Sequence, residues 1–172
     1  WPVASSASLK LPMDVWSDGQ SMVVADAGNN RVLVWTSWPT SGEAGDVVLG
    51  HLNFSAVGEN SEMGELPRTR PTGRTLNNPF GVSSDGSSLA VADMFNNRVL
   101  IWNTFPPESG RHADIVIGQS EFDQSMMNDP DHDHDVDGPT ANVLYWPARV
   151  LLTADKLFVS DYMNNRVLAF DR

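Results

Sequence analysis

The chain has 172 residues and a formal net charge of −11, from 22 acidic and 11 basic residues. This charge would repel a phosphate backbone or an anionic bilayer surface, so we expect neither nucleic acid nor a membrane among the partners. The absence of cysteine excludes disulfides, thiol catalysis and cysteine-based zinc sites. No apolar run approaches the roughly 18 residues that span a bilayer.

An internal repeat organises the chain. Its core reads VVADAGNNRVLVW over 23–35, AVADMFNNRVLIW over 90–102 and FVSDYMNNRVLAF over 158–170. Each copy is preceded by a proline, 14 residues before its aspartate, and the first two are followed by DVVLGHLNF (46–54) and DIVIGQSEF (114–122). Such self-similarity at a fixed period is the signature of a repeat architecture.

Each repeat predicts a series of short strands. The first strand follows the proline, around Val15, Val82 and Val150, and the second runs into the aspartate. Asn-Asn-Arg then predicts a tight turn, because asparagine tolerates left-handed backbone. The third strand covers Val-Leu-x-Trp/Phe, and the fourth covers 47–49 or 115–117. Four antiparallel strands with apolar residues on both faces are typical of a β-propeller blade.

The V-x-D-x-x-N-N-R-V core resembles the NHL-repeat family, and the resemblance covers nearly the whole chain. It implies an all-β fold, a single β-propeller segment over 1–172 with three four-stranded blades. NHL propellers are usually six-bladed, so this segment would form half of a ring. The residues do not fix the cellular location, and the resemblance to bacterial members is compatible with an extracytoplasmic one. The expected divisions are blade 1 over 9–54, insertion 55–75, blade 2 over 76–122, insertion 123–143 and blade 3 over 144–172.

The third repeat stops at Arg172, directly after its third strand. We therefore expect an incomplete last blade with an exposed edge over 167–170, and exposed edges need to be covered. One interpretation is a homodimer in which two copies join head to tail and close a six-bladed ring. Residues Trp1–Ala4 would then supply the missing strand across the junction. The alternative is that the chain is a fragment of a longer gene product.

The recurring Asp-x-x-Asn-Asn-Arg motif is expected to be structural. Aspartate and asparagine side chains bond readily to the backbone of turns, and the arginine can pair with the aspartate. A triplicated binding site is the alternative. The motif residues are Asp26, Asn30, Arg31, Asp93, Asn97, Arg98, Asp161, Asn165 and Arg166.

The second insertion contains the run NDPDHDHDVDG over 128–138. Alternating carboxylates with a following glycine match the opening of a calcium loop, which makes Asp131, Asp133, Asp135 and Asp137 candidate ligands of Ca²⁺. The pattern departs from a complete EF-hand, because Leu144 stands where a bidentate glutamate would be. The neighbouring histidines, His132 and His134, could instead recruit zinc. A solvated acidic loop without a metal is the alternative.

Positions that vary among otherwise matching repeats mark a candidate ligand face near the mouth of the expected channel. They lie around the repeat proline and in the turns, where the pair 94–95 also varies. Ordinary blade-specific packing is the alternative. His51, which stands where the second repeat has Gln119, is expected at the surface of a strand end. The ligand-face candidates are Asp14, Asn78, Tyr145, Trp146, Arg149 and Tyr162.

The sequence lacks the nucleophile-elbow, metalloprotease, P-loop and dinucleotide motifs. NHL propellers frequently bind proteins, peptides or glycans, so the resemblance favours a non-catalytic binding module. It also allows an enzyme, since a peptidyl-α-hydroxyglycine amidating lyase is an NHL-type propeller and related folds include metal-dependent lactonases. No ligand set for such an axial metal can be placed on these residues, so the binding module is the leading interpretation.

Overall fold

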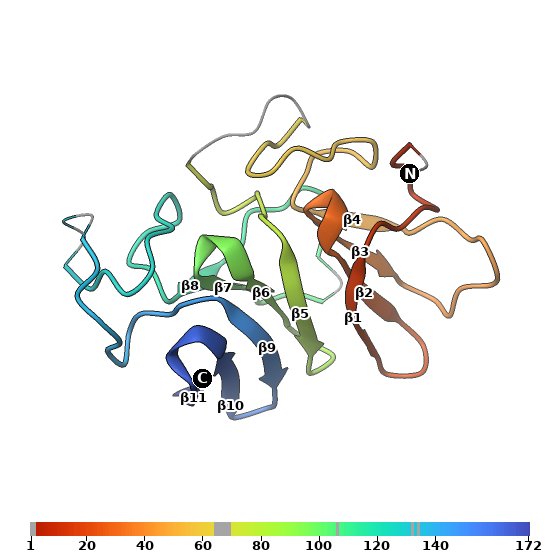
Figure 1. The fold of residues 1–172 in the computed structure, drawn as a ribbon. Coiled ribbons are helices and arrows are strands. Elements are labelled where there is room, and N and C mark those ends of the chain that lie inside the picture. The colour runs from red at the N-terminus through yellow and green to blue at the C-terminus, as the bar shows by residue number, and fades with distance from the viewer. Residues whose placement is uncertain (1–2, 64–69, 106, 132, 134) are drawn as a thin grey trace.

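The computed structural model describes residues 3–63, 70–105, 107–131, 133 and 135–172. Within these residues the chain is all-β, with eleven strands in three antiparallel sheets (Figure 1). Each sheet contains one short 3-10 helix between its second and third strands. These helices are η1 (Ala27–Asn29), η2 (Met94–Asn96) and η3 (Tyr162–Asn164). None of the helices in this part of the chain is long and apolar enough to cross a membrane.

The strands follow one another in sequence order within each sheet. The first sheet contains β1 (Pro12–Ser17), β2 (Met22–Asp26), β3 (Arg31–Trp35) and β4 (Val47–Leu49). The second sheet contains β5 (Pro79–Ser84), β6 (Leu89–Asp93), β7 (Arg98–Trp102) and β8 (Ile115–Ile117). The third sheet contains β9 (Pro147–Leu152), β10 (Lys156–Asp161) and β11 (Arg166–Asp171). The strands thus lie where the repeat predicts them. Among the described residues, the third sheet has three strands, as expected for the incomplete last repeat.

The predicted left-handed turn is present in every repeat. Asn30, Asn97 and Asn165 follow the 3-10 helices with φ of 54°, 52° and 52°. In each case the backbone N–H of the asparagine donates to the carbonyl three residues earlier, which closes the turn. The aspartate that ends the second strand pairs in register with the arginine that begins the third. The turn therefore sets the register of both strands.

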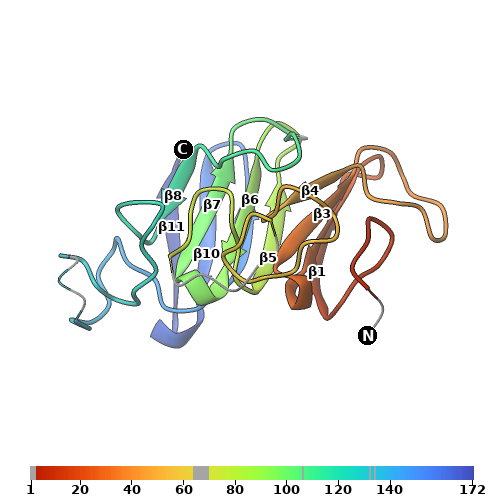
Figure 2. The same ribbon diagram turned by 90° about the horizontal axis from the view of Figure 1, so that it is seen from above.

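The three sheets stack face to face, with the first strands β1, β5 and β9 side by side (Figures 1 and 2). One apolar core lies between the first and second sheets, where Val23 and Val34 pack with Val91 and Leu100. A second core lies between the second and third sheets. The central strands of the second sheet, β6 and β7, are therefore buried on both faces.

The outer face of the third sheet is exposed. Its strands alternate, so that Leu151, Phe158 and Val167 face solvent while their neighbours in sequence are buried or partly buried. The equivalent positions of the second sheet are buried beneath the third sheet. Val167 is 68% exposed, whereas its counterpart Val99 is fully buried. The same strand sequence pattern thus has two environments, depending on whether another sheet follows.

Candidate functional site

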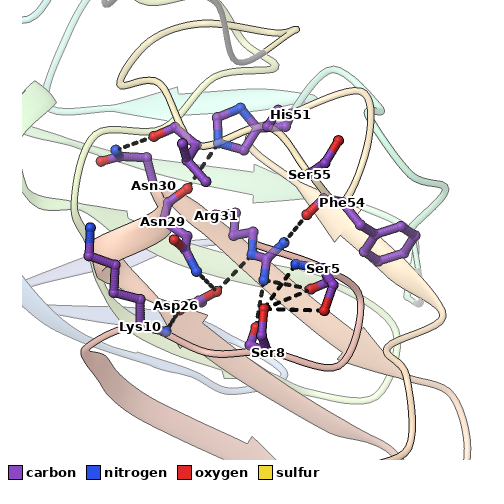
Figure 3. A network of polar contacts seen from close by, with 12 residues as sticks. Ser5, Ser8, Lys10, Asp26, Asn29, Asn30, Arg31, His51, Phe54 and Ser55 are labelled. Carbon is purple, nitrogen blue, oxygen red and sulfur yellow. Dashed lines mark hydrogen bonds and ion pairs between the residues drawn. The ribbon is translucent and has the colours of Figure 1, made fainter. Parts of the chain in front are cut away.

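The Asp-x-x-Asn-Asn-Arg motif forms a buried polar network, shown for the first repeat in Figure 3. Asp26 Oδ2 accepts from Asn29 Nδ2 at 2.9 Å and from Arg31 Nε at 2.7 Å. Asp26 Oδ1 accepts the backbone N–H of Lys10 at 2.6 Å. The guanidinium of Arg31 also donates to backbone carbonyls of the segment that precedes β1 and to that of Phe54. Every bond of this network holds the turn or an adjoining loop, which supports a structural role.

The second and third repeats build the same network. Asp93 Oδ2 accepts from Asn96 and Arg98, both at 2.8 Å. In the third repeat, Asp161 Oδ2 accepts from Asn164 at 2.8 Å and from Arg166 at 2.7 Å. The aspartate also accepts a backbone N–H from the segment before the first strand, that of Asn77 or Tyr145. The three repeats therefore share the same hydrogen-bond network around the turn.

The left-handed asparagines connect neighbouring repeats. Asn30 Oδ1 accepts the backbone N–H of Asn78, and Asn97 Oδ1 accepts that of Trp146, both at 2.9 Å. The amide Nδ2 of Asn30 donates to the carbonyl of Val57 in the first insertion. Two of the candidate ligand-face residues are thus positioned through their backbone by the turn of the preceding repeat.

Each insertion docks on a 3-10 helix through a pair of side-chain amides that is not among the predicted site residues. Asn60 and Asn96 exchange side-chain hydrogen bonds at 3.0 and 2.8 Å. Asn128 and Asn164 do so at 2.9 Å in both directions. Each pair joins residues 36 positions apart, and this shared spacing was the available signal. The insertions therefore lie on the side of the sheets that carries the turns.

Asp14 and Arg149, two of the candidates, lie together on the innermost strands. Arg149 Nη1 is 3.6 Å from Asp14 Oδ2, and the guanidinium also donates to the carbonyls of Phe80 at 2.9 Å and Met13 at 3.2 Å. Asp14 accepts the N–H of Val82 at 3.0 Å. These contacts cross-link β1, β5 and β9. Arg149 remains half exposed, so part of its charge is still available to a ligand.

Aromatic side chains gather where the second and third repeats meet. The Trp146 ring lies 5.5 Å from that of Phe95 and 5.7 Å from that of Tyr145. Phe95 comes from η2 and is exposed, as is Tyr162 of η3. We call Phe95, Tyr145, Trp146 and Tyr162 the aromatic face. Phe95 is the member that the candidate set lacked, and variation of the pair 94–95 between repeats was its signal.

The residue before each repeat proline has a left-handed backbone. Leu11, Asn78 and Trp146 have φ of 49°, 53° and 52°. Asparagine adopts this conformation readily, whereas a bulky residue is strained by about 1–2 kcal/mol. Of the three, the candidate Asn78 is therefore the residue with the least backbone strain, and its Nδ2 lies 3.9 Å from Met94 Sδ. Trp146 keeps its large side chain at a backbone position that disfavours it.

Three carboxylates converge in the acidic loop. One oxygen from each of Asp129, Asp131 and Asp137 lies within 4.8 Å of the other two. The predicted ligands Asp133 and Asp135 are not in this group, and Asp133 Oδ1 instead accepts the backbone N–H of Asp135. Asp129 is not part of the alternating Asp pattern; it is buried next to Asn128, and its position follows from the docking of Asn128 on η3.

Electrostatics within the loop favour a proton or a cation. The pKa of Asp137 is raised by partial desolvation and by the negative charges of the surrounding aspartates. Oxygen ligands of this kind suit Ca²⁺, which takes carboxylates and carbonyls. His132 and His134, the candidate zinc ligands, lie outside the described residues.

His51 is fully buried, so its predicted surface position is wrong. Its Nδ1 lies 2.7 Å from the carbonyl oxygen of Ser61, and its Nε2 lies 3.0 Å from that of Asn29. The first insertion folds back over the end of β4 and covers the imidazole. Burial lowers the pKa of His51, because the charged form loses its hydration.

No protein-family model matches the chain, and no curated protein matches it. Among solved structures, a chain in the crystal structure of a nidogen/laminin complex is similar, with a TM-score of 0.40 and 19% sequence identity. The match covers 95% of this chain and 60% of that chain, so this chain spans about three fifths of its length.

Proposed function

We propose that the chain is a non-catalytic binding module, an NHL-type β-propeller segment that binds a protein, peptide or glycan ligand on the side formed by turns and insertions. The observation that carries this proposal is the aromatic face. Phe95 and Tyr162 are exposed, and Tyr145 and Trp146 are partly exposed. Aromatic rings at a surface supply large contact areas at low loss of side-chain freedom, and they stack on apolar groups and sugar rings.

Asp14 and Arg149 add polar groups to the proposed face, and these could orient a bound ligand through hydrogen bonds. Arg149 and Asp14 lie on the innermost strands, and Arg149 offers a half-exposed guanidinium. The net charge of −11 favours a neutral or cationic ligand over an anionic one. The combination of aromatic rings with one charged pair is the usual composition of a specific binding site.

The test uses two tryptophan variants on peptide and glycan arrays. Trp146→Asn removes the centre of the aromatic face and leaves a residue suited to the backbone conformation. Trp38→Asn removes an exposed tryptophan from the loop between β3 and β4, and it is the matched control. We expect array signals that are lost with Trp146→Asn and kept with Trp38→Asn. Equal loss in both variants, or no ligand above background, would contradict the proposed face.

We further propose that a second copy covers the exposed face of the third sheet and the exposed strand β1 of the first sheet, and closes a six-bladed ring. Support comes from the repeat itself. Leu76 and Leu144, which precede β5 and β9, are fully buried, whereas their counterpart Leu9 before β1 is exposed. The outer face of the third sheet is likewise exposed, whereas the equivalent face of the second sheet is covered by the third sheet. Light scattering should give a mass near twice 18.8 kDa that Val167→Asp reduces to one chain. A single-chain mass for the wild type would contradict ring closure by a second copy.

Binding of Ca²⁺ by the acidic loop is proposed on the convergence of Asp129, Asp131 and Asp137. Calorimetric titration of EDTA-treated protein should show heat that Asp137→Asn abolishes. The control is Asp123→Asn, at an exposed carboxylate paired with Arg70 outside the group. Absence of heat in the wild type, with an unchanged melting temperature, would remove this proposal.

A further inference from the structure

The junction between the second and third sheets carries aromatic side chains that the junction between the first and second sheets lacks. Phe95 of η2 lies there with Tyr145 and Trp146, which directly precede β9. The backbone is the same at both junctions, because the left-handed asparagine of one repeat accepts a backbone N–H from the segment before the next first strand. At the earlier junction the equivalent residues are Gly28, Asn77 and Asn78. The rings therefore belong to this junction and not to the repeat.

The three rings leave part of their surface open to a ligand. The Trp146 ring is tilted by 43° to that of Phe95 at 5.5 Å, and it meets that of Tyr145 edge to face at 5.7 Å. Rings at such angles do not cover one another's faces completely. Phe95 is 45% exposed, and Tyr145 and Trp146 are partly exposed. This opening lies between η2 on one side and the start of β9 on the other, so the chain itself supplies both walls.

The insertion beside the rings is strongly acidic. The first insertion, 55–75, contains three glutamates and three arginines, so its charges balance. The second insertion, 123–143, contains no lysine or arginine, and its acidic residues are Asp123, Asp129, Asp131, Asp133, Asp135 and Asp137. Aromatic rings and negative charge are therefore added at the same junction, although the two features lie on separate segments of the sequence.

One side chain connects the acidic insertion with the tryptophan. Asn97 Nδ2 donates to the carbonyl of Ser125, and Asn97 Oδ1 accepts the backbone N–H of Trp146, both at 2.9 Å. Asn97 also follows Phe95 by two residues, at the end of η2. In Figure 2 the second insertion lies at the end of the sheets that carries the 3-10 helices. The negative charges and the rings therefore lie on the same side of the molecule.

A cationic side chain fits this combination of groups. The face of an aromatic ring carries partial negative charge, and lysine or arginine binds over it, most strongly over tryptophan. Negative charge around such a site raises the local concentration of a basic partner and its rate of association. The basic residues nearest to the rings in the sequence are Arg98 and Arg149. Arg98 is buried and paired with Asp93 at 2.8 Å, and Arg149 lies 3.6 Å from Asp14, so each of these positive charges has a carboxylate beside it.

We propose that the ligand of this face is a basic segment of a partner polypeptide, with an arginine or lysine side chain over the rings of Phe95 and Trp146 and further basic residues near the second insertion. The proposal rests on the binding function proposed above, and it narrows the ligand from a protein, peptide or glycan to a basic polypeptide. A neutral glycan also stacks on such rings, but the aspartates of the insertion would add nothing to its affinity. The charge of the insertion therefore favours the basic polypeptide.

The test measures the fluorescence anisotropy of a labelled peptide of alternating arginine and glycine, added to the full chain in EDTA so that no Ca²⁺ occupies the acidic loop. We expect saturable binding that a peptide with glutamine in place of arginine does not show. Phe95→Met and Trp146→Asn introduce the residue types that other repeats have at these positions, and each should weaken binding by about threefold or more. Neutralisation of two exposed aspartates of the loop, Asp133→Asn with Asp135→Asn, should also weaken binding, by a factor that falls as salt is added.

The matched control removes the same charge from the other end of the sheets. Asp18→Asn with Asp155→Asn changes two exposed aspartates in the β1–β2 and β9–β10 connections, which lie at the opposite strand ends from the 3-10 helices. Because charges are screened over about 8 Å at physiological ionic strength, this variant should bind the peptide as the wild type does.

Three outcomes would overturn the proposal. The first is absence of saturable binding to a protein whose unfolding transition is intact. The second is an equal loss of affinity in the loop variant and in its control, which would mean that binding follows net charge alone. The third is full binding by both Phe95→Met and Trp146→Asn, which would place the peptide away from the rings. Array signals from neutral ligands that Trp146→Asn removes, without binding of the arginine peptide, would reject the basic ligand and leave the proposed binding function standing. Arrays without any signal that depends on Trp146 would reject that function itself.

Discussion

The second and third sheets contain the same turn and the same ion pair in different surroundings. Asp93 and Arg98 lie 2.8 Å apart, and Asp161 and Arg166 lie 2.7 Å apart. Arg98 is fully buried, whereas Arg166 is 24% exposed. The second sheet has a fourth strand, a following insertion and a sheet on each face. Local sequence thus determines the geometry of the motif. The elements packed around it determine how much water reaches the ion pair and how much the pair contributes to the free energy of unfolding.

The largest contrast is expected between Val99→Asp and Val167→Asp. Val99 lies between the second and third sheets, so an aspartate there would bury an unpaired charge and lower the free energy of unfolding by about 4 kcal/mol or more. The equivalent change at the exposed Val167 should stay within about 0.5 kcal/mol. Urea unfolding at low protein concentration, where copies are separate, measures both. Similar effects for the two variants would mean that the third sheet has a covered face in solution.

The next contrast compares Asp93→Ala with Asp161→Ala. Loss of Asp93 leaves the buried guanidinium of Arg98 unpaired, and breaking such a pair destabilises by about 3–5 kcal/mol. Asp161→Ala leaves Arg166, which water can reach, so we expect about 1–3 kcal/mol. The measurement is again the free energy of unfolding in urea.

The repeat allowed much of the fold to be predicted. Aligned prolines, aspartates and Asn-Asn-Arg turns fix the strands, because one register is used three times. Contacts that involve the insertions could not be predicted in the same way. His51 is buried because the first insertion folds back and places the carbonyl of Ser61 against its ring. Asp129 joins the acidic group because Asn128, its neighbour in sequence, docks on η3. Periodic patterns specify strands, but they do not specify the path of a loop.

A smaller effect is expected from His51→Gln, which gives the first repeat the residue of the second. The lowered pKa of His51 means that the folded state binds fewer protons than the unfolded state. Its contribution to stability is therefore present above about pH 6.5 and lost as the pH falls below that value. Gln119 Nε2 donates to the carbonyls of Asn97 at 3.1 Å and Met126 at 2.8 Å without any charge.

The measurement is the free energy of unfolding in urea for the wild type and His51→Gln, each at pH 7 and pH 5. Between these pH values the free energy of unfolding of the wild type should fall by on the order of 1 kcal/mol more than that of His51→Gln. His112→Gln, at a partly buried histidine in the second repeat, is the control and should keep the loss of the wild type. An equal loss in the wild type and His51→Gln would assign the pH dependence to other groups.

The smallest effects concern the left-handed position before each repeat proline, which has a different residue in every repeat. Leu11→Asn should raise the free energy of unfolding by about 0.5–1 kcal/mol, because the exposed leucine contributes little packing and asparagine relieves the backbone strain. Trp146→Asn relieves the same strain but loses ring contacts with Phe95 and Tyr145, worth about 0.5–1.5 kcal/mol each. It should therefore be neutral or slightly destabilising. Thermal unfolding separates the two, since about 1 kcal/mol shifts Tm by roughly 2–4 °C in a chain of this size. Stabilisation by Trp146→Asn equal to that by Leu11→Asn would mean that the ring contacts of the tryptophan add nothing to the stability of the fold.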